Sequence, residues 1–272
     1  MSAKTGWRGK PVKPSIVHDR LKGPFKPDMN APLCPQVLSM NKEDYLLWVH
    51  TAHHLEKPAR FFPYDWAELF TRTAWYVVPI VWWPVALFLV LPGFKHVGTG
   101  ATLTMFLLGL WTWSITEYLL HRFVFHVDEL LPDHPLALFT HFLTHGVHHL
   151  IPMDRYRLVM PPALVVPLIG LTWTFFRTIL FFVHWSSFWA FYGGLVAAYV
   201  VYDLIHYFSH HGWKVDRNSH LGRMKTYHMQ HHFADHYHEG YGITSTFWDV
   251  VFGTVIAGWG SKPAAAQEDG HQ

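Results

Sequence analysis

Two long apolar stretches without a charged side chain restrict this chain to a membrane-embedded helical fold. Residues 73–94 and 97–116 contain no Asp, Glu, Lys or Arg, and each is long enough to cross a bilayer core as an α-helix. Residues 161–202 are apolar again, interrupted by Arg177 and the segment 184–187. That length fits two further spans joined by a short turn, or a re-entrant pair. Charged residues make up only 15% of the chain, against about 25% in soluble domains.

The order of these stretches predicts two helical hairpins that open toward the same face of the membrane. The second span returns the chain to its starting face near residue 121, and the fourth span returns it near residue 206. The first 44 residues have no apolar run, so we expect no cleavable signal peptide. Their excess of Lys and Arg over acidic residues predicts that the shared face is cytoplasmic.

The predicted fold class is therefore all-α integral membrane, with about four transmembrane helices in two hairpins and a histidine-rich cytoplasmic cap. Along the chain we expect a basic N-terminal cytoplasmic arm (1–44), a membrane-embedded domain (45–258) and a disordered C-terminal tail (259–272). A nucleic-acid partner is not expected, because the basic arm leads directly toward the membrane spans.

Histidine is the residue type that points to chemistry, with 23 copies. Ten of them form two pairs and two triplets that the hairpin topology places on one face of the membrane. They are His121 and His126, His145, His148 and His149, His206 and His210, and His228, His231 and His232. Neutral imidazole is the commonest metal-ligating side chain, and one tetrahedral site needs about four ligands. Ten candidates therefore predict two metal ions.

The spacing within the clusters indicates how the rings are presented. Each triplet has the i, i+3, i+4 pattern, and His206 and His210 have the i, i+4 pattern, both of which share a helix face. His121 and His126 are five residues apart, which directs them about 140° apart on an ideal α-helix. That pair is expected to straddle a helix end or to serve two different metals.

Spacing alone also selects His50, His53 and His54, a third triplet that precedes the first span on the same face. The single cysteine, Cys34, excludes a thiolate site. Imidazole suits zinc, copper, iron and nickel. Zinc has no redox chemistry, so a pair used for oxidation would be iron. The acids Glu117, Asp203 and Asp249 are expected to orient ligand rings, or else to be capping or solvated acids.

Several longer motifs resemble the fatty acid 2-hydroxylases of sphingolipid synthesis. They are HRFVFH (121–126), HGVHHLIPMDRYRLVMPP (145–162), YDLIHYFSHH (202–211), KTYHMQHHF (225–233), GYGITSTFWDVVFGT (240–254) and, upstream, RFFPYDWAELFTRTAWYVVPIVWWPV (60–85). The resemblance runs from about residue 28 to residue 254. It implies a multi-pass enzyme of the endoplasmic reticulum membrane that hydroxylates the alpha carbon of the acyl chain of ceramide or a related sphingolipid.

The same resemblance implies a set of ligands and partners. The family's histidine motifs fall on all ten clustered histidines, and none falls on residues 50, 53 and 54. The implied cofactors are two metal ions, iron in the active form with zinc able to substitute, and dioxygen is the co-substrate. Many relatives begin with a fused b-type cytochrome domain. This sequence begins where that domain would end, as in the plant members, so a separate b-type cytochrome and its reductase are the expected electron donors.

Three residues are candidates for binding the substrate's polar group. Tyr199, Tyr202 and Asp203 come about one to two turns before His206, where they could hold an amide or hydroxyl, or could form an aromatic belt and a cap. Other functions remain open at this point: a sterol-type oxidase or desaturase of the same superfamily, a membrane metal-binding or transport protein, and a structural zinc protein.

Overall fold

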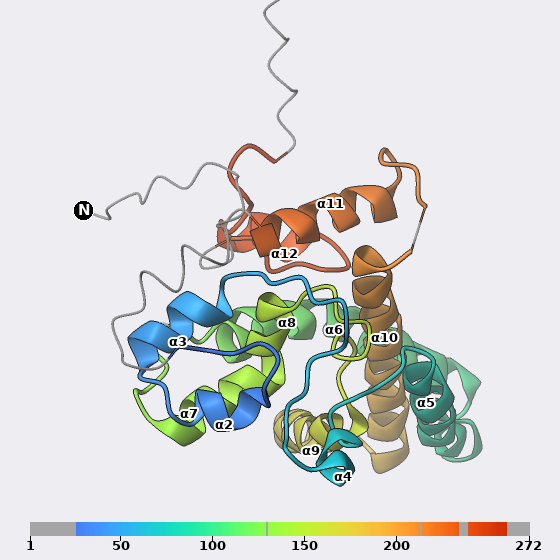
Figure 1. Ribbon diagram of the computed structural model, residues 1–272. Coiled ribbons are helices and arrows are strands. Elements are labelled where there is room, and N and C mark those ends of the chain that lie inside the picture. The colour runs from blue at the N-terminus through green and yellow to red at the C-terminus, as the bar shows by residue number, and fades with distance from the viewer. Residues whose placement is uncertain (1–25, 129, 213, 234–238, 260–272) are drawn as a thin grey trace, which may run out of the picture.

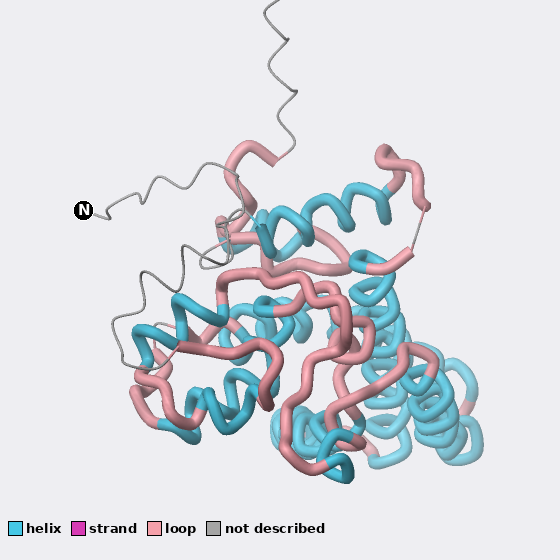
Figure 2. The backbone as a smooth tube through the Cα atoms, viewed as in Figure 1, coloured by secondary structure: helices cyan, strands magenta, loops and turns pink. Residues whose placement is uncertain are grey.

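The computed structural model describes residues 26–128, 130–212, 214–233 and 239–259. Every regular element within these ranges is helical, and no strand occurs in them (Figure 2). Residues 1–25 of the predicted arm and residues 260–272 of the predicted tail lie outside the described residues.

Four helices in the described part of the chain are long and apolar enough to cross a membrane. They are α5 (Val77–His96), α6 (Thr99–Leu120, continued to Phe125 by a π-turn), α9 (Pro162–Ile179) and α10 (Trp185–His210). The predicted hairpins are confirmed: Val97 and Gly98 connect α5 to α6, and residues 180–184 connect α9 to α10. Gly98 has a φ of 83°, a backbone conformation that favours glycine at this tight turn.

Helix α10 is the centre of the bundle and packs along both α5 and α6 (Figure 1). Glycines make this close packing possible. A methyl group on Gly109 of α6 would collide with the backbone carbonyl of Phe191, and one on Gly194 of α10 would collide with that of Phe106. Small residues allow backbones to approach in membranes, where no hydrophobic force drives helices together.

Helix α9 is placed differently from the other three. It is seen nearly end-on in Figure 1, whereas α10 is seen along its length, so the two helices cross. Among the residues of α9 only Val165 is buried, and large apolar side chains such as Val166, Leu171 and Phe175 are exposed. The helix therefore leaves most of its apolar surface exposed and packs only one narrow side against its neighbours.

The cap consists of short helices on both sides of the histidine clusters. Helices α2 (Leu33–Val37) and α3 (Lys42–Val49) pack on α7 (Pro135–His141) and α8 (Val147–Leu150). Their shared apolar core includes Leu33, Tyr45, Trp48, Phe142 and Leu150. The Tyr45 hydroxyl bonds to Nδ1 of His141 at 2.6 Å. Residues 33–44, which the sequence assigns to the arm, thus form part of the folded cap.

Two further helices and one buried ion pair complete the cap. Helix α11 (His220–Phe233) contacts α10, and α12 (Phe247–Phe252) contacts α6. Below them, α4 (Asp65–Glu68) is tied to the loop before α9, because Arg157 donates to Glu68 Oε2 at 2.6 Å and to Thr71 Oγ1 at 2.7 Å. Both Glu68 and Arg157 are buried.

Candidate metal centre

A π-turn resolves the five-residue spacing of the first histidine pair. Helix α6 ends at Leu120, and η1 (His121–Phe125) follows with one additional residue in the turn. The amide N–H of His126 donates to the carbonyl of His121 at 3.0 Å, an i to i−5 bond. The extra residue brings the two rings to the same side, with centroids 4.9 Å apart. His126 directly follows the last residue of η1, so the pair straddles the end of this continuous helix, as predicted. Both rings belong to one group and do not serve two different metals.

The ten predicted histidines assemble into two groups of five, each able to hold a metal ion. In each group one ligating nitrogen per residue lies within 4.8 Å of all the others, and every member is buried. The first group is His121, His126, His145, His149 and His231. The second group is His148, His206, His210, His228 and His232.

Each triplet contributes to both groups. His145 and His149 face the first group while His148 faces the second, and His228 and His232 face the second group while His231 faces the first. On an α-helix, residue i+4 lies about 40° to one side of residue i and residue i+3 about 60° to the other. The i, i+4 rings therefore converge on one point and the i+3 ring is directed to the neighbouring point.

Backbone carbonyls fix which nitrogen of two rings faces inward. Nδ1 of His121 donates to the carbonyl of Tyr241 at 2.6 Å, and Nδ1 of His231 donates to the carbonyl of Glu239 at 3.0 Å. A carbonyl can only accept, so in each neutral ring the proton lies on Nδ1 and the lone pair on Nε2. Nε2 of His121 is buried without a hydrogen bond to any described residue. These lone pairs point toward the shared centre of the group.

The distances between Nε2 atoms fit a metal. In the first group the Nε2 atoms of His126, His145 and His149 form a triangle with sides of 3.0, 3.0 and 3.2 Å. In the second group Nε2 of His228 lies 2.9 Å from that of His210 and 3.1 Å from that of His232. Tetrahedral nitrogen ligands at about 2.0–2.1 Å from a metal lie about 3.3 Å apart. A cation among the lone pairs removes the repulsion that such a triangle otherwise has.

Burial keeps these rings in the protonation state that binds metal. The pKa values of His145, His148, His149, His228 and His232 are all lowered well below the usual 6.5, first because burial disfavours the charged ring and then because neighbouring histidines do. Neutral imidazole has the free lone pair that a metal needs. Protonation therefore does not compete with metal at physiological pH.

A carboxylate that sequence reasoning did not single out lies beside the first group. Asp128 approaches Nδ1 of His126 at 3.6 Å, Nε2 of His141 at 3.4 Å and Nε2 of His50 at 3.5 Å. Its position two residues after His126, a predicted ligand, could have identified it from the sequence. Carboxylates in this position orient ligand rings and raise their basicity.

Two of the three acids that the sequence suggested, Asp249 and Glu117, act at a greater distance, whereas Asp203 accepts a hydrogen bond from Tyr199. Asp249 accepts hydrogen bonds from the backbone N–H groups of Tyr241 and Gly242 at 3.0 and 2.8 Å, so it holds the loop whose carbonyl orients His121. Glu117 accepts from the N–H and hydroxyl of Thr244 in the same loop.

The third triplet does not converge on one centre. His50 packs edge-on against His149 with ring centroids 5.6 Å apart and belongs to a small group with His126 and Asp128. His53 is buried and its Nδ1 bonds to the carbonyl of Thr51 at 2.6 Å. His54 is exposed.

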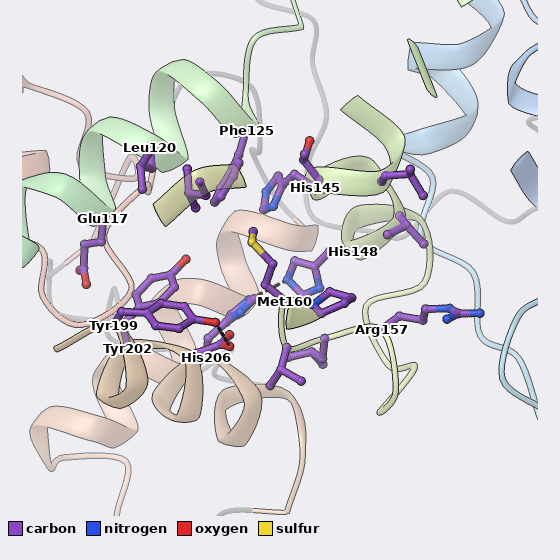
Figure 3. Close-up of a pocket in the computed structure, with 18 of the residues that line it drawn as sticks. Glu117, Leu120, Phe125, His145, His148, Arg157, Met160, Tyr199, Tyr202 and His206 are labelled. Atoms are coloured by element: carbon purple, nitrogen blue, oxygen red, sulfur yellow. Dashed lines mark hydrogen bonds between the residues drawn. The ribbon is translucent and has the colours of Figure 1, made fainter. Parts of the chain in front are cut away.

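A small cavity of about 60 Å³ opens beside both histidine groups (Figure 3). Its wall includes His145 of the first group and His148 and His206 of the second. Tyr199, Tyr202 and Asp203, the predicted substrate-binding residues, line it as well. The hydroxyl of Tyr199 donates to Asp203 Oδ2 at 3.1 Å. The cavity therefore combines polar groups with apolar walls next to the histidines.

A second, smaller cavity of about 30 Å³ adjoins the first. The two share Trp113 and Leu120 of α6, Leu168 of α9 and Tyr199 of α10 as walls. The second is lined almost entirely by apolar side chains of these three membrane helices. The two cavities thus lie side by side, one next to the histidines and one in the apolar part of the bundle.

Comparisons with known proteins identify the family of this chain. The sequence model of the family described as Fatty acid hydroxylase matches residues 106–254. The ceramide very long chain fatty acid hydroxylase scs7 of Schizosaccharomyces pombe is 41% identical over 251 residues, which is 89% of this chain and 69% of that protein. The dihydroceramide fatty acyl 2-hydroxylase FAH1 of Arabidopsis thaliana is 37% identical over 238 residues, 85% of this chain and 94% of that protein.

A solved structure is similar over nearly the same extent. The structure titled full length scs7p, in which only the hydroxylase domain is visible, superposes with a TM-score of 0.80 at 35% sequence identity and covers 91% of each chain. The family match includes all ten clustered histidines, since it runs from before His121 to beyond His232. This chain therefore belongs to the fatty acid hydroxylase family.

Proposed function

We propose that this protein hydroxylates the alpha carbon of the fatty acyl chain of a ceramide or related sphingolipid. The observation that carries the proposal is a cavity with polar groups beside the two histidine groups, next to a smaller apolar cavity between membrane helices. Relatives with 37–41% identity are named as hydroxylases of ceramide or dihydroceramide acyl chains. A substrate with a polar head group and a lipid tail matches this combination of polar groups and apolar membrane helices.

The ten histidines are the proposed ligands of two metal ions, five for each ion. Their burial, the lowered pKa values of the five histidines named above and the inward Nε2 lone pairs of His121 and His231 support this role. Iron is the metal of the active form and zinc is an inactive substitute, because zinc cannot change its oxidation state. When bound, the iron pair supplies the redox chemistry of dioxygen. Overall, one C–H bond, one dioxygen molecule, two electrons and two protons give one C–OH group and one water.

Tyr199, Tyr202 and Asp203 are the proposed anchors for the polar part of the substrate. All three lie on α10 and face the same cavity as His206. The Asp203 carboxylate can accept from an amide N–H or a hydroxyl, and a tyrosine hydroxyl can donate to a carbonyl. The alpha carbon is bonded to the acyl carbonyl carbon, so an anchor this close to the histidines sets the position of hydroxylation.

The protein is proposed to lie in the endoplasmic reticulum membrane with the histidine groups on the cytoplasmic side. The four apolar helices indicate a multi-pass protein, and the basic N-terminal residues support a cytoplasmic side for the cap. A glycosylation acceptor inserted near residue 153 tests the side. It stays unmodified if the cap is cytoplasmic, and its glycosylation would place the cap in the lumen.

A separate b-type cytochrome, reduced by its reductase, is the proposed electron donor. A surface groove on α11 supports a protein donor with an acidic face. Arg217, Arg223 and Lys225 line this groove together with Met229, which directly follows the buried His228. A donor bound there would be separated from the second histidine group by about one helix diameter, roughly 10 Å.

Expression in a host without its own enzyme tests the reaction. Mass spectrometry should detect sphingolipids whose acyl chain has gained one oxygen at the alpha carbon, and labelled dioxygen should provide that atom. Membranes depleted of donors should be inactive until the cytochrome and its reductase are added. An unsaturated product, or hydroxylated sterol with unchanged ceramides, would contradict the proposal and favour the desaturase or sterol alternative.

A further inference from the structure

One acid in the wall of the cavity beside the histidine groups has an oxygen without a described partner. Glu117 of α6 lines this cavity together with Tyr202 and Asp203 of α10. Figure 3 shows its side chain extending from α6 into the same region as Tyr199 and Tyr202. Glu117 is buried, with 3% of its surface exposed. Its Oε2 atom accepts no hydrogen bond from any described residue, although buried polar groups nearly always have a partner.

The other oxygen of Glu117 fixes the carboxyl group in place. Oε1 accepts from the Thr244 hydroxyl at 2.6 Å and from the Thr244 N–H at 3.1 Å. The buried acids Glu68 and Asp249 differ from Glu117, because both oxygens of each accept hydrogen bonds. Holding the loop at Thr244 therefore requires only Oε1, and Oε2 remains as an acceptor whose position is already set.

A hydrogen-bond donor lies one helical turn from this acceptor. Trp113 is four residues before Glu117, on the same face of α6, and lines the same cavity. It is close enough to interact with the Glu117 carboxyl, yet its Nε1, like Oε2, has no hydrogen bond to a described residue. Its ring packs edge-on against Tyr199 and Tyr202, with centroids 5.6 and 5.5 Å apart. The cavity wall thus presents an acceptor and a donor side by side.

A hydroxyl group complements this pair, because it donates one hydrogen bond and also accepts. Its proton is donated to Glu117 Oε2, and its oxygen accepts from Trp113 Nε1. An acyl thioester has no donor and an ionised fatty acid has only acceptors, so both leave Oε2 unpaired. A water needs at least about 10–15 Å³ of a cavity, so a cavity of about 60 Å³ holds roughly four groups of that size. This room suits an amide and a hydroxyl.

Spacing along the two helices fits an amide with a hydroxyl close to it. Glu117 is four residues before His121 on α6, and Asp203 is three residues before His206 on α10. These separations are about 6 and 4.5 Å along the helix axes. In an N-acylated amino alcohol the amide nitrogen is two bonds and the hydroxyl oxygen five bonds from the alpha carbon, and five bonds span about 6 Å. With the alpha carbon beside the histidines, the hydroxyl can reach Glu117 while the amide lies near Asp203.

We propose that Glu117 and Trp113 bind a hydroxyl of the amino-alcohol part of the substrate, a proposal that rests on the function proposed above. The pair extends the proposed anchor from α10 to α6, so the head group is held from two helices. Glu117 and Trp113 are specificity-determining residues, since they contact the head group and not the reacting carbon. The preference that they set is independent of the length of the acyl chain.

The test is a competition in membranes that contain the full-length protein and its donor system. The two substrates are a ceramide and an analogue with the same acyl chain that lacks the hydroxyls of the amino alcohol. Mass spectrometry gives the ratio of the two alpha-hydroxylated products. The wild-type protein should favour the ceramide by about 100-fold, about tenfold for each hydrogen bond. Glu117→Gln should lower the ratio about tenfold, because its oxygen stays with Thr244 and an NH₂ group, which only donates, replaces Oε2.

Trp113→Phe removes the N–H but keeps an aromatic ring. It should also lower the ratio about tenfold, and it decides the outcome if the glutamine variant fails to fold. Trp82→Phe is the matched control, because it removes a buried indole N–H that also has no described partner but lies outside the wall of this cavity. Thr244→Ala weakens only the contact of Oε1. Both controls should keep the wild-type ratio, even where total activity falls.

A wild-type ratio near one overturns the proposal. So does a wild-type ratio in active Glu117→Gln and Trp113→Phe proteins, since equal losses for both substrates would limit Glu117 to its contact with the loop. Absence of hydroxylated product from the wild-type protein with either substrate would instead reject the proposed function.

Discussion

The carbonyl of Tyr241 accepts a 2.6 Å hydrogen bond from Nδ1 of His121, a residue 120 positions earlier in the chain. This bond joins the loop before α12 to the end of α6 and fixes the tautomer of His121. The same loop is held by Asp249 through the N–H groups of Tyr241 and Gly242. The orientation of the first histidine group thus depends on residues that bind no metal themselves.

Asp249→Ala is expected to lower the metal affinity of the first group by about 10- to 100-fold, because the carbonyl that orients His121 loses its support. Metal content after dialysis against a series of chelator concentrations measures the effect. Asp65→Ala removes an exposed carboxylate that pairs with Arg60 and should leave metal content unchanged. Equal metal retention in the Asp249 and Asp65 variants would show that the loop does not orient the site.

The two histidine groups predict two metal ions per chain. His148→Ala should lose the ion of the second group and His231→Ala that of the first, and both should be inactive, since each removes a ring from one group of five. His54→Ala changes an exposed ring and should keep both ions and full activity. Elemental analysis of well-folded protein measures the content, and a wild-type value near one or zero would reject the two-ion assignment.

Asp128 predicts a role for a carboxylate beside the first group. Asp128→Ala should lower metal affinity by about 10- to 100-fold, because the acid lies beside the outer nitrogen of His126. Asp128→Asn retains the shape and a carbonyl acceptor and should recover part of this loss. Metal titration of the three proteins checks the order, and equal affinities in all three would assign Asp128 a purely structural role.

The Glu68–Arg157 pair predicts a specific dependence of stability on pH. Burial by itself opposes the charged carboxylate, but hydrogen bonds from the Phe62 N–H and from Arg157 outweigh it and lower the pKa of Glu68 below its usual 4.5. A folded-state pKa below the unfolded one stabilises the protein fully above about pH 4.5, and the contribution is lost as pH falls through the folded value.

Glu68→Gln should therefore be less stable than wild type near neutral pH, and the difference should shrink on acidification below about pH 4.5. Thermal unfolding of both proteins in the same detergent at several pH values measures this difference. Glu56→Gln, at an exposed position, is the control and should follow wild type throughout. A Glu68→Gln difference that stays constant across the pH range would show that the carboxylate charge contributes nothing.

The basic groove on α11 predicts a salt-dependent interaction with the electron donor. Arg217→Glu combined with Arg223→Glu should raise the donor concentration needed for half-maximal rate by about tenfold at low salt, and by less at high salt. Lys57→Glu changes an exposed charge outside the groove and should have little effect. With a small chemical reductant in place of the protein donor, the wild type, the double variant and Lys57→Glu should have equal activity. An unchanged donor requirement would place the donor elsewhere.

The sequence determined the membrane helices and the identity of the clustered histidines. Uncharged runs at 73–94 and 97–116 can only be stable as helices in a bilayer, and the structure has α5 and α6 there. The i, i+3, i+4 spacing places the three rings of a triplet on one face of its own helix. The triplets could therefore be recognised as candidate ligands from the sequence, without knowing which residues lie opposite them. The resemblance over long motifs also predicted the family that the comparisons show.

Only the tertiary structure decided how those elements combine. The division of each triplet between two groups depends on where α8 lies relative to α11, and the register of the π-turn at His121 depends on the packing around it. His50 reaches Asp128 beside His126, and Tyr241 reaches His121, from distant parts of the chain. Local spacing encodes the direction of a side chain from its own helix, whereas its partner is set by long-range packing that one sequence does not reveal.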